Sequence, residues 1–168
     1  MRRFQIGLLI FLGIIFASSC EKDDICVEGD TPLLVIEFYD VTDTSALKEV
    51  TTLRAVGVGQ NVTVNTVTDR STVSTISIPL KTDEDATSFI LISSSAENED
   101  GIETGNVDTI TFSYNRLDDF LSRGCGFVIN YDELQGSLTA DNNNWIQDIE
   151  ITQSLVTNSD STHVKIFH

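Results

Sequence analysis

The chain has 168 residues, of which 40% are hydrophobic and 21% are charged, enough apolar sequence for one packed domain. Asp and Glu number 26 against ten Lys and Arg, which gives a formal net charge of -16. This charge excludes a general nucleic-acid binder, which needs a basic face to neutralise phosphates, and it disfavours adsorption to anionic lipid headgroups. We therefore expect no nucleic-acid partner.

The first 19 residues are typical of a cleaved secretory signal peptide. Arg2 and Arg3 precede an apolar run at residues 6–16, and three small residues follow at positions 17–19. The apolar run has 11 residues, whereas a transmembrane helix needs about 20. We predict that residues 1–19 direct export and are then removed.

Cys20 follows the signal peptide at once. The tetrapeptide Ala17-Ser18-Ser19-Cys20 resembles the bacterial lipobox, although Ala17 stands where Leu is usual. The resemblance implies that Cys20 becomes the first residue of the mature chain and carries acyl chains such as palmitate. Each buried CH₂ group contributes about 0.8 kcal/mol, so two or more acyl chains make a stable membrane anchor.

The residues after Cys20 suggest where the anchored protein goes. Glu21-Lys22-Asp23-Asp24 resembles the surface-export signal of Bacteroidota lipoproteins, a Lys followed by two acidic residues. The resemblance implies an outer-membrane protein that faces the cell exterior, and a solvated acidic tether is the alternative. We interpret residues 20–29 as the lipidated tether.

The three cysteines are Cys20, Cys26 and Cys125. Acylation would use Cys20 and leave an even pair in an oxidising compartment. We predict a disulfide between Cys26 and Cys125, with two buried free thiols as the alternative. Three cysteines cannot form a Cys₄ zinc site, and we expect no metal and no cofactor.

Residues 30–168 contain eight or nine short runs typical of β-strands, separated by polar clusters. The run at residues 107–114 alternates most clearly, with Ile110 and Phe112 inward and Thr109 outward. This spacing, together with the abundance of Thr and Val, predicts an all-β domain over residues 30–168, an antiparallel β-sandwich of Ig-like or jelly-roll-like type. The residues expected in its core are Ile76, Ile78, Ile110, Phe112, Phe127, Ile129, Val164 and Ile166.

Residues 115–123 depart from the strand pattern. Leu117, Phe120 and Leu121 recur at helical spacing. We predict one short helix near residues 117–122 that crosses between the sheets.

The sequence has few groups suited to catalysis. It contains no phosphate-binding loop, nucleophile elbow or zinc-protease motif. His163 and His168 are expected to be solvated, and Asp118 and Asp119 are adjacent and so point apart rather than flank a bond. We expect no enzyme.

Weaker signals mark other candidate sites. Trp145 is expected in the core, with an exposed sugar-stacking platform as the alternative. Thr109 and Ser161 lie in tripeptides that resemble the O-glycosylation acceptor of Bacteroidota. The oxygen-rich stretches at residues 98–108 and 141–144 lack calcium-loop spacing and are interpreted as acidic turns.

Several segments together resemble an uncharacterised family of small lipoproteins from flavobacteria and their relatives. They are residues 20–26 and 31–40, Arg116 with residues 125–127, and residues 163–167. The resemblance implies a lipoprotein with a β-rich domain, and it brings no activity, cofactor or catalytic residue.

The features favour a non-catalytic, lipid-anchored protein of the cell surface that binds or supports an envelope partner, either a protein or a polysaccharide. A glycan-binding module, with Trp145 exposed, is the alternative. A hydrolase is a third hypothesis, and it would need His163 within hydrogen-bond reach of a Ser or Asp.

Overall fold

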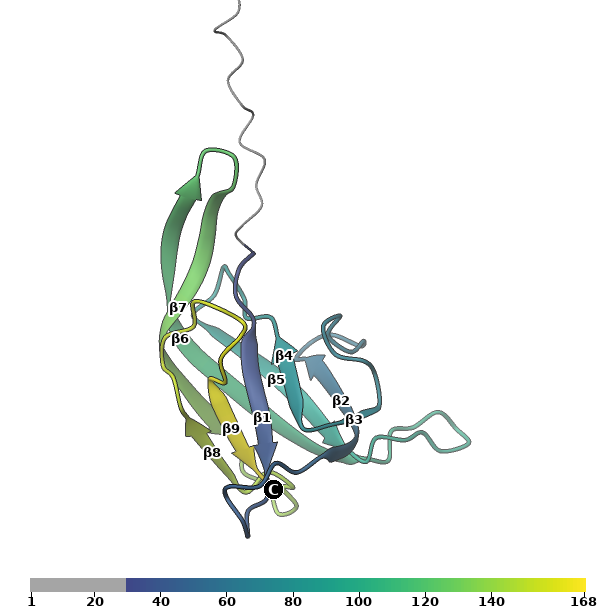
Figure 1. Cartoon of the computed structure of the whole chain (residues 1–168). Coiled ribbons are helices and arrows are strands. Elements are labelled where there is room, and N and C mark those ends of the chain that lie inside the picture. The colour runs from purple at the N-terminus through teal and green to yellow at the C-terminus, as the bar shows by residue number, and fades with distance from the viewer. Residues whose placement is uncertain (1–29) are drawn as a thin grey trace, which may run out of the picture.

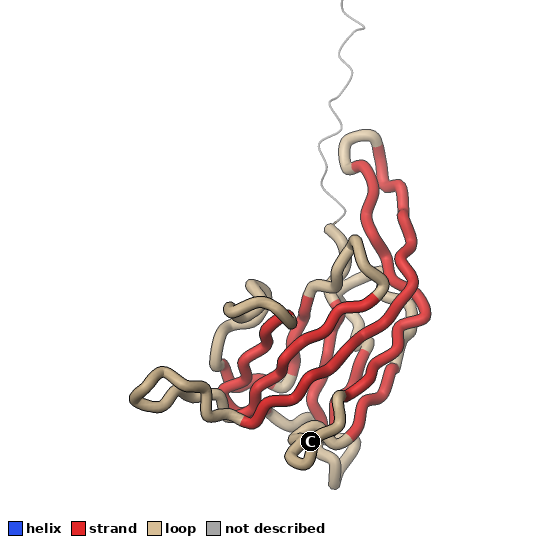
Figure 2. The backbone as a smooth tube through the Cα atoms, turned by 180° about the vertical axis from the view of Figure 1, so that it is seen from behind, coloured by secondary structure: helices blue, strands red, loops and turns tan. Residues whose placement is uncertain are grey.

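The computed structural model describes residues 30–168, which form strands and loops (Figures 1 and 2). The predicted signal peptide, Cys20, the export signal and Cys26 lie outside the described residues. The strands are β1 (Leu34–Tyr39), β2 (Val50–Gly57), β3 (Ser71–Val73), β4 (Thr75–Ile78), β5 (Ala86–Ser93), β6 (Asn106–Ser122), β7 (Gly126–Leu138), β8 (Asp148–Ile151) and β9 (Val164–Phe167).

The strands form two sheets, as a β-sandwich requires. The four-stranded sheet has the order β4-β1-β9-β8, and the five-stranded sheet has the order β3-β2-β5-β6-β7. Every strand pair is antiparallel except β1 with β9, which run parallel with Ile36 opposite Val164. The predicted β-sandwich is confirmed, and its four-stranded sheet is mixed rather than purely antiparallel.

The core lies between the sheets and follows the alternation of the strands. In β6, Ile110 and Phe112 are fully buried while Thr109 faces outward and is half-buried. The tightest aromatic contact in the core joins Tyr114 of β6 and Tyr131 of β7, with ring centroids 4.8 Å apart. Six residues that were expected in the core are buried: Ile76, Ile78, Ile110, Phe112, Val164 and Ile166.

The predicted helix near residues 117–122 is wrong, because this segment is the second half of β6. It pairs with β7, with Leu117 opposite Asn130 and Phe120 opposite Phe127. β7 has one extra residue between its partners of Ser113 and Asn115, so the register shifts there by one. Cross-strand pairing therefore overrides a helical spacing that rested on three apolar residues.

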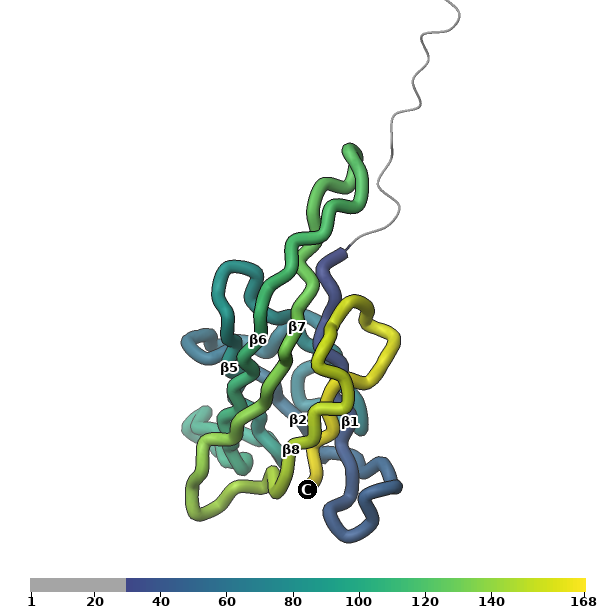
Figure 3. The backbone as a smooth tube through the Cα atoms, turned by 90° about the vertical axis from the view of Figure 1, so that its left-hand side faces the viewer, coloured from purple at the N-terminus to yellow at the C-terminus, as the bar shows by residue number. Residues whose placement is uncertain are grey.

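Beyond this shift, β6 and β7 continue as a two-stranded hairpin that projects from the sandwich (Figures 1 and 3). We call residues 115–130 the arm. Phe127 shares a face with Tyr131, as its alternation predicted, but the prediction that it is buried is wrong: it is 67% exposed, and Ile129 is half-buried. The described chain begins at the end of the sandwich that carries the arm, and the C-terminus lies at the opposite end (Figure 1).

Candidate functional site

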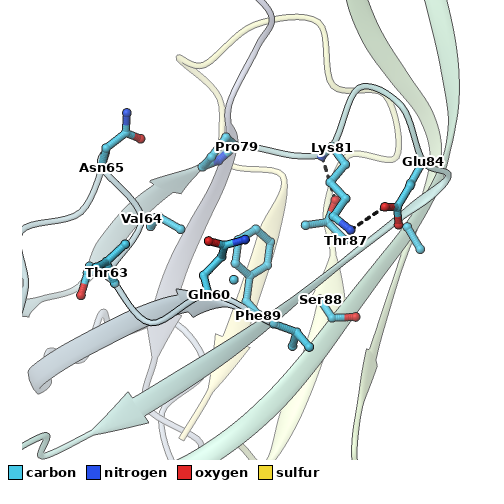
Figure 4. Close-up of a pocket in the computed structure, with 14 residues that line it drawn as sticks. Gln60, Thr63, Val64, Asn65, Pro79, Lys81, Glu84, Thr87, Ser88 and Phe89 are labelled. Carbon is cyan, nitrogen blue, oxygen red and sulfur yellow. Dashed lines mark hydrogen bonds and ion pairs between the residues drawn. The ribbon is translucent and has the colours of Figure 1, made fainter.

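A pocket of about 520 Å³ opens beside β5, where β2 stops short (Figure 4). β2 ends at Gly57 opposite Phe89, while β5 begins three residues earlier, at Ala86. Residues 86–88 therefore pair with β6 on one side and line the pocket on the other. The remaining walls come from residues 57–65, which follow β2, and residues 79–84, which join β4 to β5.

The backbone of β5 faces this pocket with hydrogen-bonding groups. The carbonyl of Ser88 accepts a hydrogen bond from the Val58 amide on the β2 side, whereas the carbonyl of Asp85 accepts one from the Tyr114 amide on the β6 side. Because backbone groups alternate along a strand, those of Ala86 point to the same side as those of Ser88. Ala86 lies past the end of β2, so its N–H and C=O point towards the pocket.

Buried hydroxyls hold one wall in place. The Lys81 amide donates to Thr87 Oγ1 at 2.8 Å, and Thr87 Oγ1 lies 2.5 Å from the hydroxyl of Tyr114. That hydroxyl donates to the Lys81 carbonyl at 3.0 Å. Tyr131 donates in turn to the carbonyl of Leu80, and burial raises the pKa of its hydroxyl to about 12. Leu80 and Lys81 of this wall are therefore hydrogen-bonded to the core residues Tyr131 and Tyr114.

The opposite wall is a loop closed by its own backbone. The Gln60 amide donates to the Gly57 carbonyl at 2.9 Å, and Gly59 between them has a φ of 86°, which suits glycine. The Val64 amide donates a hydrogen bond to the Ala55 carbonyl of β2. Gln60 and Phe89 both line the pocket (Figure 4).

The chemistry of the pocket is mainly apolar with polar groups at the rim. Apolar surface comes from Val58, Val62, Val64 and Pro79, whereas Phe89 lines the pocket but is 2% exposed. At one side Lys81 Nζ forms an ion pair with Glu84 at 2.7 Å, and the hydrogen bond to Glu84 raises the pKa of the lysine. These groups can bind and orient a ligand. No sequence pattern predicted this pocket, and the one local signal that could have indicated it is the Gly57-Val58-Gly59 interruption of a strand-like run.

Trp145 does not form a free platform. It is half-buried, its indole N–H donates to the Leu91 carbonyl at 3.3 Å, and its ring contacts Phe38 and His168 with centroids 6.2 Å and 5.5 Å away. The expectation that Trp145 packs on the core fits this geometry. His168 was expected to be solvated, but it is half-buried in this aromatic group because the chain ends against β1.

His163 was expected on the outward face, and this is wrong: it is fully buried. Its Nδ1 accepts a hydrogen bond from the Val35 amide at 3.1 Å, which makes the histidine part of the contact between the end of the chain and β1. Burial lowers the pKa of the ring. Its Nε2 has no hydrogen-bond partner in the described structure, so no Ser or Asp hydroxyl or carboxylate bonds to this atom there.

The turn at residues 141–144 is organised by a buried carboxylate. Asp108 is fully buried in β6 and accepts hydrogen bonds from Asn144 Nδ2 at 3.0 Å and from the Ile146 amide at 2.8 Å. Asp141 accepts from the Asn143 amide. These oxygens close the turn, in line with the interpretation of the segment as an acidic turn.

The carboxylate of Glu103 organises the loop between β5 and β6 by accepting several hydrogen bonds. Its carboxylate accepts hydrogen bonds from the Ser95 hydroxyl at 2.8 Å and the amides of Ala96 and Gly105 at 3.0 and 2.9 Å. Arg54 and Arg70 lie 3.5 and 3.6 Å from Oε2, the oxygen that accepts from Ser95. Burial acts to raise the pKa of Glu103, but the hydrogen bonds from Gly105, Ser95 and Ala96 and the charge of Arg70 lower it to about 2.

The other candidate residues stay apart from the pocket. Asp118 and Asp119 lie opposite Ile129 and Val128 on successive positions of the arm, so they point to opposite faces, as expected. Thr109 and Ser161 are half-buried, and their glycosylation stays a prediction. Among residues 30–168, no group of three or more His, Cys, Asp or Glu is placed to hold a metal ion. No helix in that same range is long and apolar enough to cross a membrane.

The fold and pocket define a β-sandwich protein with one candidate binding site. Residues 52–168 match a family of unknown function, DUF6452, and the chain belongs to this family. The match begins within β2, after the residues of the predicted signal and tether. Comparison with curated proteins and with solved structures finds no match.

Proposed function

We propose that the protein is a non-catalytic, lipid-anchored protein of the cell envelope that binds an extended, apolar segment of a partner protein in the pocket beside β5. The observation that carries this proposal is the uncovered start of β5. A strand whose backbone faces an apolar pocket can pair with an added extended peptide, and the neighbouring apolar surface can receive its side chains. The lipobox-like and export-like residues at positions 17–24 support the anchored location.

A polysaccharide is the alternative ligand, and the pocket favours it less. Sugar recognition relies on an aromatic face that is free to stack, whereas Trp145 is half-buried and its ring is occupied by Phe38 and His168. Phe89, the aromatic residue of the pocket, is 2% exposed, so it offers little surface for stacking.

A photoreactive amino acid in place of Gln60 tests the pocket in intact cells. Gln60 is exposed and lines the pocket, so irradiation should give a discrete adduct of higher mass. Digestion of the adduct by protease should remove the added mass, because the partner is a protein. The same photoreactive group at Leu47, which is 53% exposed outside the pocket, is the control. No adduct at position 60, the same adducts at both positions, or an added mass that resists protease would contradict the proposal.

Val62→Asp should weaken binding in the same assay. Val62 is 69% exposed and lines the pocket, so the change should leave the fold intact and place a carboxylate against apolar ligand groups. We expect roughly tenfold weaker binding, since an unpaired charge against an apolar surface costs on the order of 1–2 kcal/mol. Leu47→Asp makes the same change in charge elsewhere and should leave the adduct yield unchanged. Equal losses for both variants would show that net charge, rather than the pocket, controls binding.

Two variants separate anchoring from export. Cys20→Ala removes the predicted acylation site, so the chain should become soluble or keep its signal peptide. Replacing Lys22, Asp23 and Asp24 by Ala keeps the anchor but should leave the protein facing the periplasm. Protease treatment of intact cells is the measurement. If the unaltered protein resists the protease as fully as the triple variant does, surface export is refuted while lipidation stands.

A further inference from the structure

The end of the arm projects from the sandwich (Figure 1) and exposes apolar side chains. We call residues 120–127 the tip of the arm. Phe120 and Phe127 are cross-strand partners with ring centroids 5.1 Å apart, and they remain 55% and 67% exposed. Leu121 follows Phe120 at the register shift between Phe120 and Ser122, and it is 38% exposed. The tip presents three apolar side chains to solvent.

The exposed apolar side chains indicate the kind of environment that the tip fits. The tip is the narrow end of a two-stranded hairpin that projects from the sandwich (Figure 1). A lipid layer surrounds whatever enters it, so all of the apolar side chains of such a tip can leave water together. Exposed aromatic and aliphatic groups gain free energy from that transfer in proportion to the apolar area buried.

The charge of the tip differs from that of the rest of the chain. The whole chain has 26 acidic residues, but the tip has none, and its one charged side chain is Arg123. An arginine beside aromatic rings suits the lipid interface, because its apolar stem lies along the chains while its guanidinium binds phosphate groups. Asp118 and Asp119 directly precede the tip, so the favourable approach to a lipid headgroup is limited to residues 120–127.

The start of the described chain lies beside the arm. The Ile129 amide donates to Thr31 Oγ1 at 3.5 Å, which places Thr31 next to the root of the tip. Cys20 is eleven residues before Thr31. At about 3.3–3.6 Å per residue, a fully extended segment of this length spans no more than about 40 Å. The described chain therefore begins at the same end of the molecule as the tip (Figure 1), and the predicted anchor at Cys20 is within reach of that end.

We propose that the tip of the arm inserts into the lipid layer in which Cys20 is anchored, so that both the acyl chains and the aromatic tip attach the protein to the membrane. This inference rests on the proposed lipid anchor and deepens it. The C-terminal end of the sandwich would then point away from the bilayer. Such a second contact would orient the sandwich, whereas the acyl chains alone leave it free to tumble on its tether.

Quenching of tryptophan by brominated lipid tests the insertion. The full-length protein, purified from membranes with its acyl chains, is reconstituted into phosphatidylcholine vesicles with and without brominated chains. Phe127→Trp and Leu121→Trp place a tryptophan on each strand of the tip, and Leu47→Trp places one near the opposite end. We expect brominated lipid to remove most of the emission added at positions 127 and 121, and none of that added at position 47 or of that from Trp145.

The outcomes separate the inference from the proposed function. If the protein floats with the vesicles but neither tip tryptophan is quenched, the anchor stands and the insertion is refuted. If the protein does not float with the vesicles, the anchor and the insertion are refuted together. Quenching at position 127 alone would show contact through one strand and contradict insertion. A change in tip emission that grows with protein concentration without vesicles would assign the tip to contact between two copies, which also overturns the proposal.

Discussion

Reduction of the oxidised protein should lower its free energy of unfolding by as much as about 4.7 kcal/mol, the value that chain entropy gives for a closed loop of roughly 100 residues. The predicted bridge joins Cys26 to Cys125, and Cys26 lies outside the described residues. Loss of the bridge frees the unfolded chain, so the change should appear as a lower midpoint of denaturation in urea.

The position of Cys125 supports this prediction through the reach of the chain. Cys125 lies in the turn of the arm, four residues before Ile129 in sequence. Ile129 is hydrogen-bonded to Thr31, and Cys26 is five residues before Thr31. Extended segments of five and four residues span about 17 and 14 Å at about 3.4 Å per residue. A chain that follows β7 outward from Thr31 can therefore bring Cys26 to Cys125.

The double variant Cys26→Ser with Cys125→Ser is the matched control for reduction. Its unfolding should not respond to reductant, and its stability should equal that of the reduced parent protein. In the oxidised parent, a thiol reagent should label neither of these two cysteines after denaturation. Stoichiometric labelling of both would refute the bridge.

The strands could be predicted from sequence where one face of a strand is buried and the other is exposed to solvent. In β6 from Val107 to Tyr114, every second side chain is buried against the other sheet, so the alternation in the sequence indicates one buried face. In the arm, the alternation of apolar and polar residues no longer indicates which side chains are buried. Phe127 keeps the alternation of β7, but among residues 30–168 no second sheet lies opposite the arm, so an apolar residue on the inner face is exposed rather than buried. The helical spacing at residues 117–121 arose from apolar residues on both faces of the arm.

The candidate site could not be predicted for a different reason. The pocket exists because β2 ends opposite Phe89 while β5 begins at Ala86, and that offset depends on the register between distant strands. His163 illustrates the same limit. Its burial results from the parallel pairing of β9 with β1, which joins residues more than 120 positions apart. Local patterns carry no information about such pairings.

Glu103→Gln should lower the free energy of unfolding at pH 7 by about 3 kcal/mol. The pKa of Glu103 falls from its usual 4.5 to about 2 in the folded protein, and each pKa unit corresponds to about 1.4 kcal/mol. The side chain of Glu103 is 22% exposed, so solvent screens the contacts only in part. Glutamine keeps the shape of the side chain but removes the charge that Arg54 and Arg70 face.

The dependence on pH distinguishes this effect from a packing defect. Between pH 2 and about 4.5 the unfolded chain binds a proton at Glu103 that the folded protein does not, so stability increases with pH in that range. The contribution is fully present above about pH 5 and is lost as the pH falls towards 2. The difference between the parent protein and Glu103→Gln should therefore shrink over this range, measured by urea denaturation at each pH. Glu99→Gln, an exposed residue of the same loop, is the control and should match the parent throughout. A loss at Glu103 that stays constant from pH 7 to pH 2 would show that the loop depends on the shape of the side chain and not on its charge.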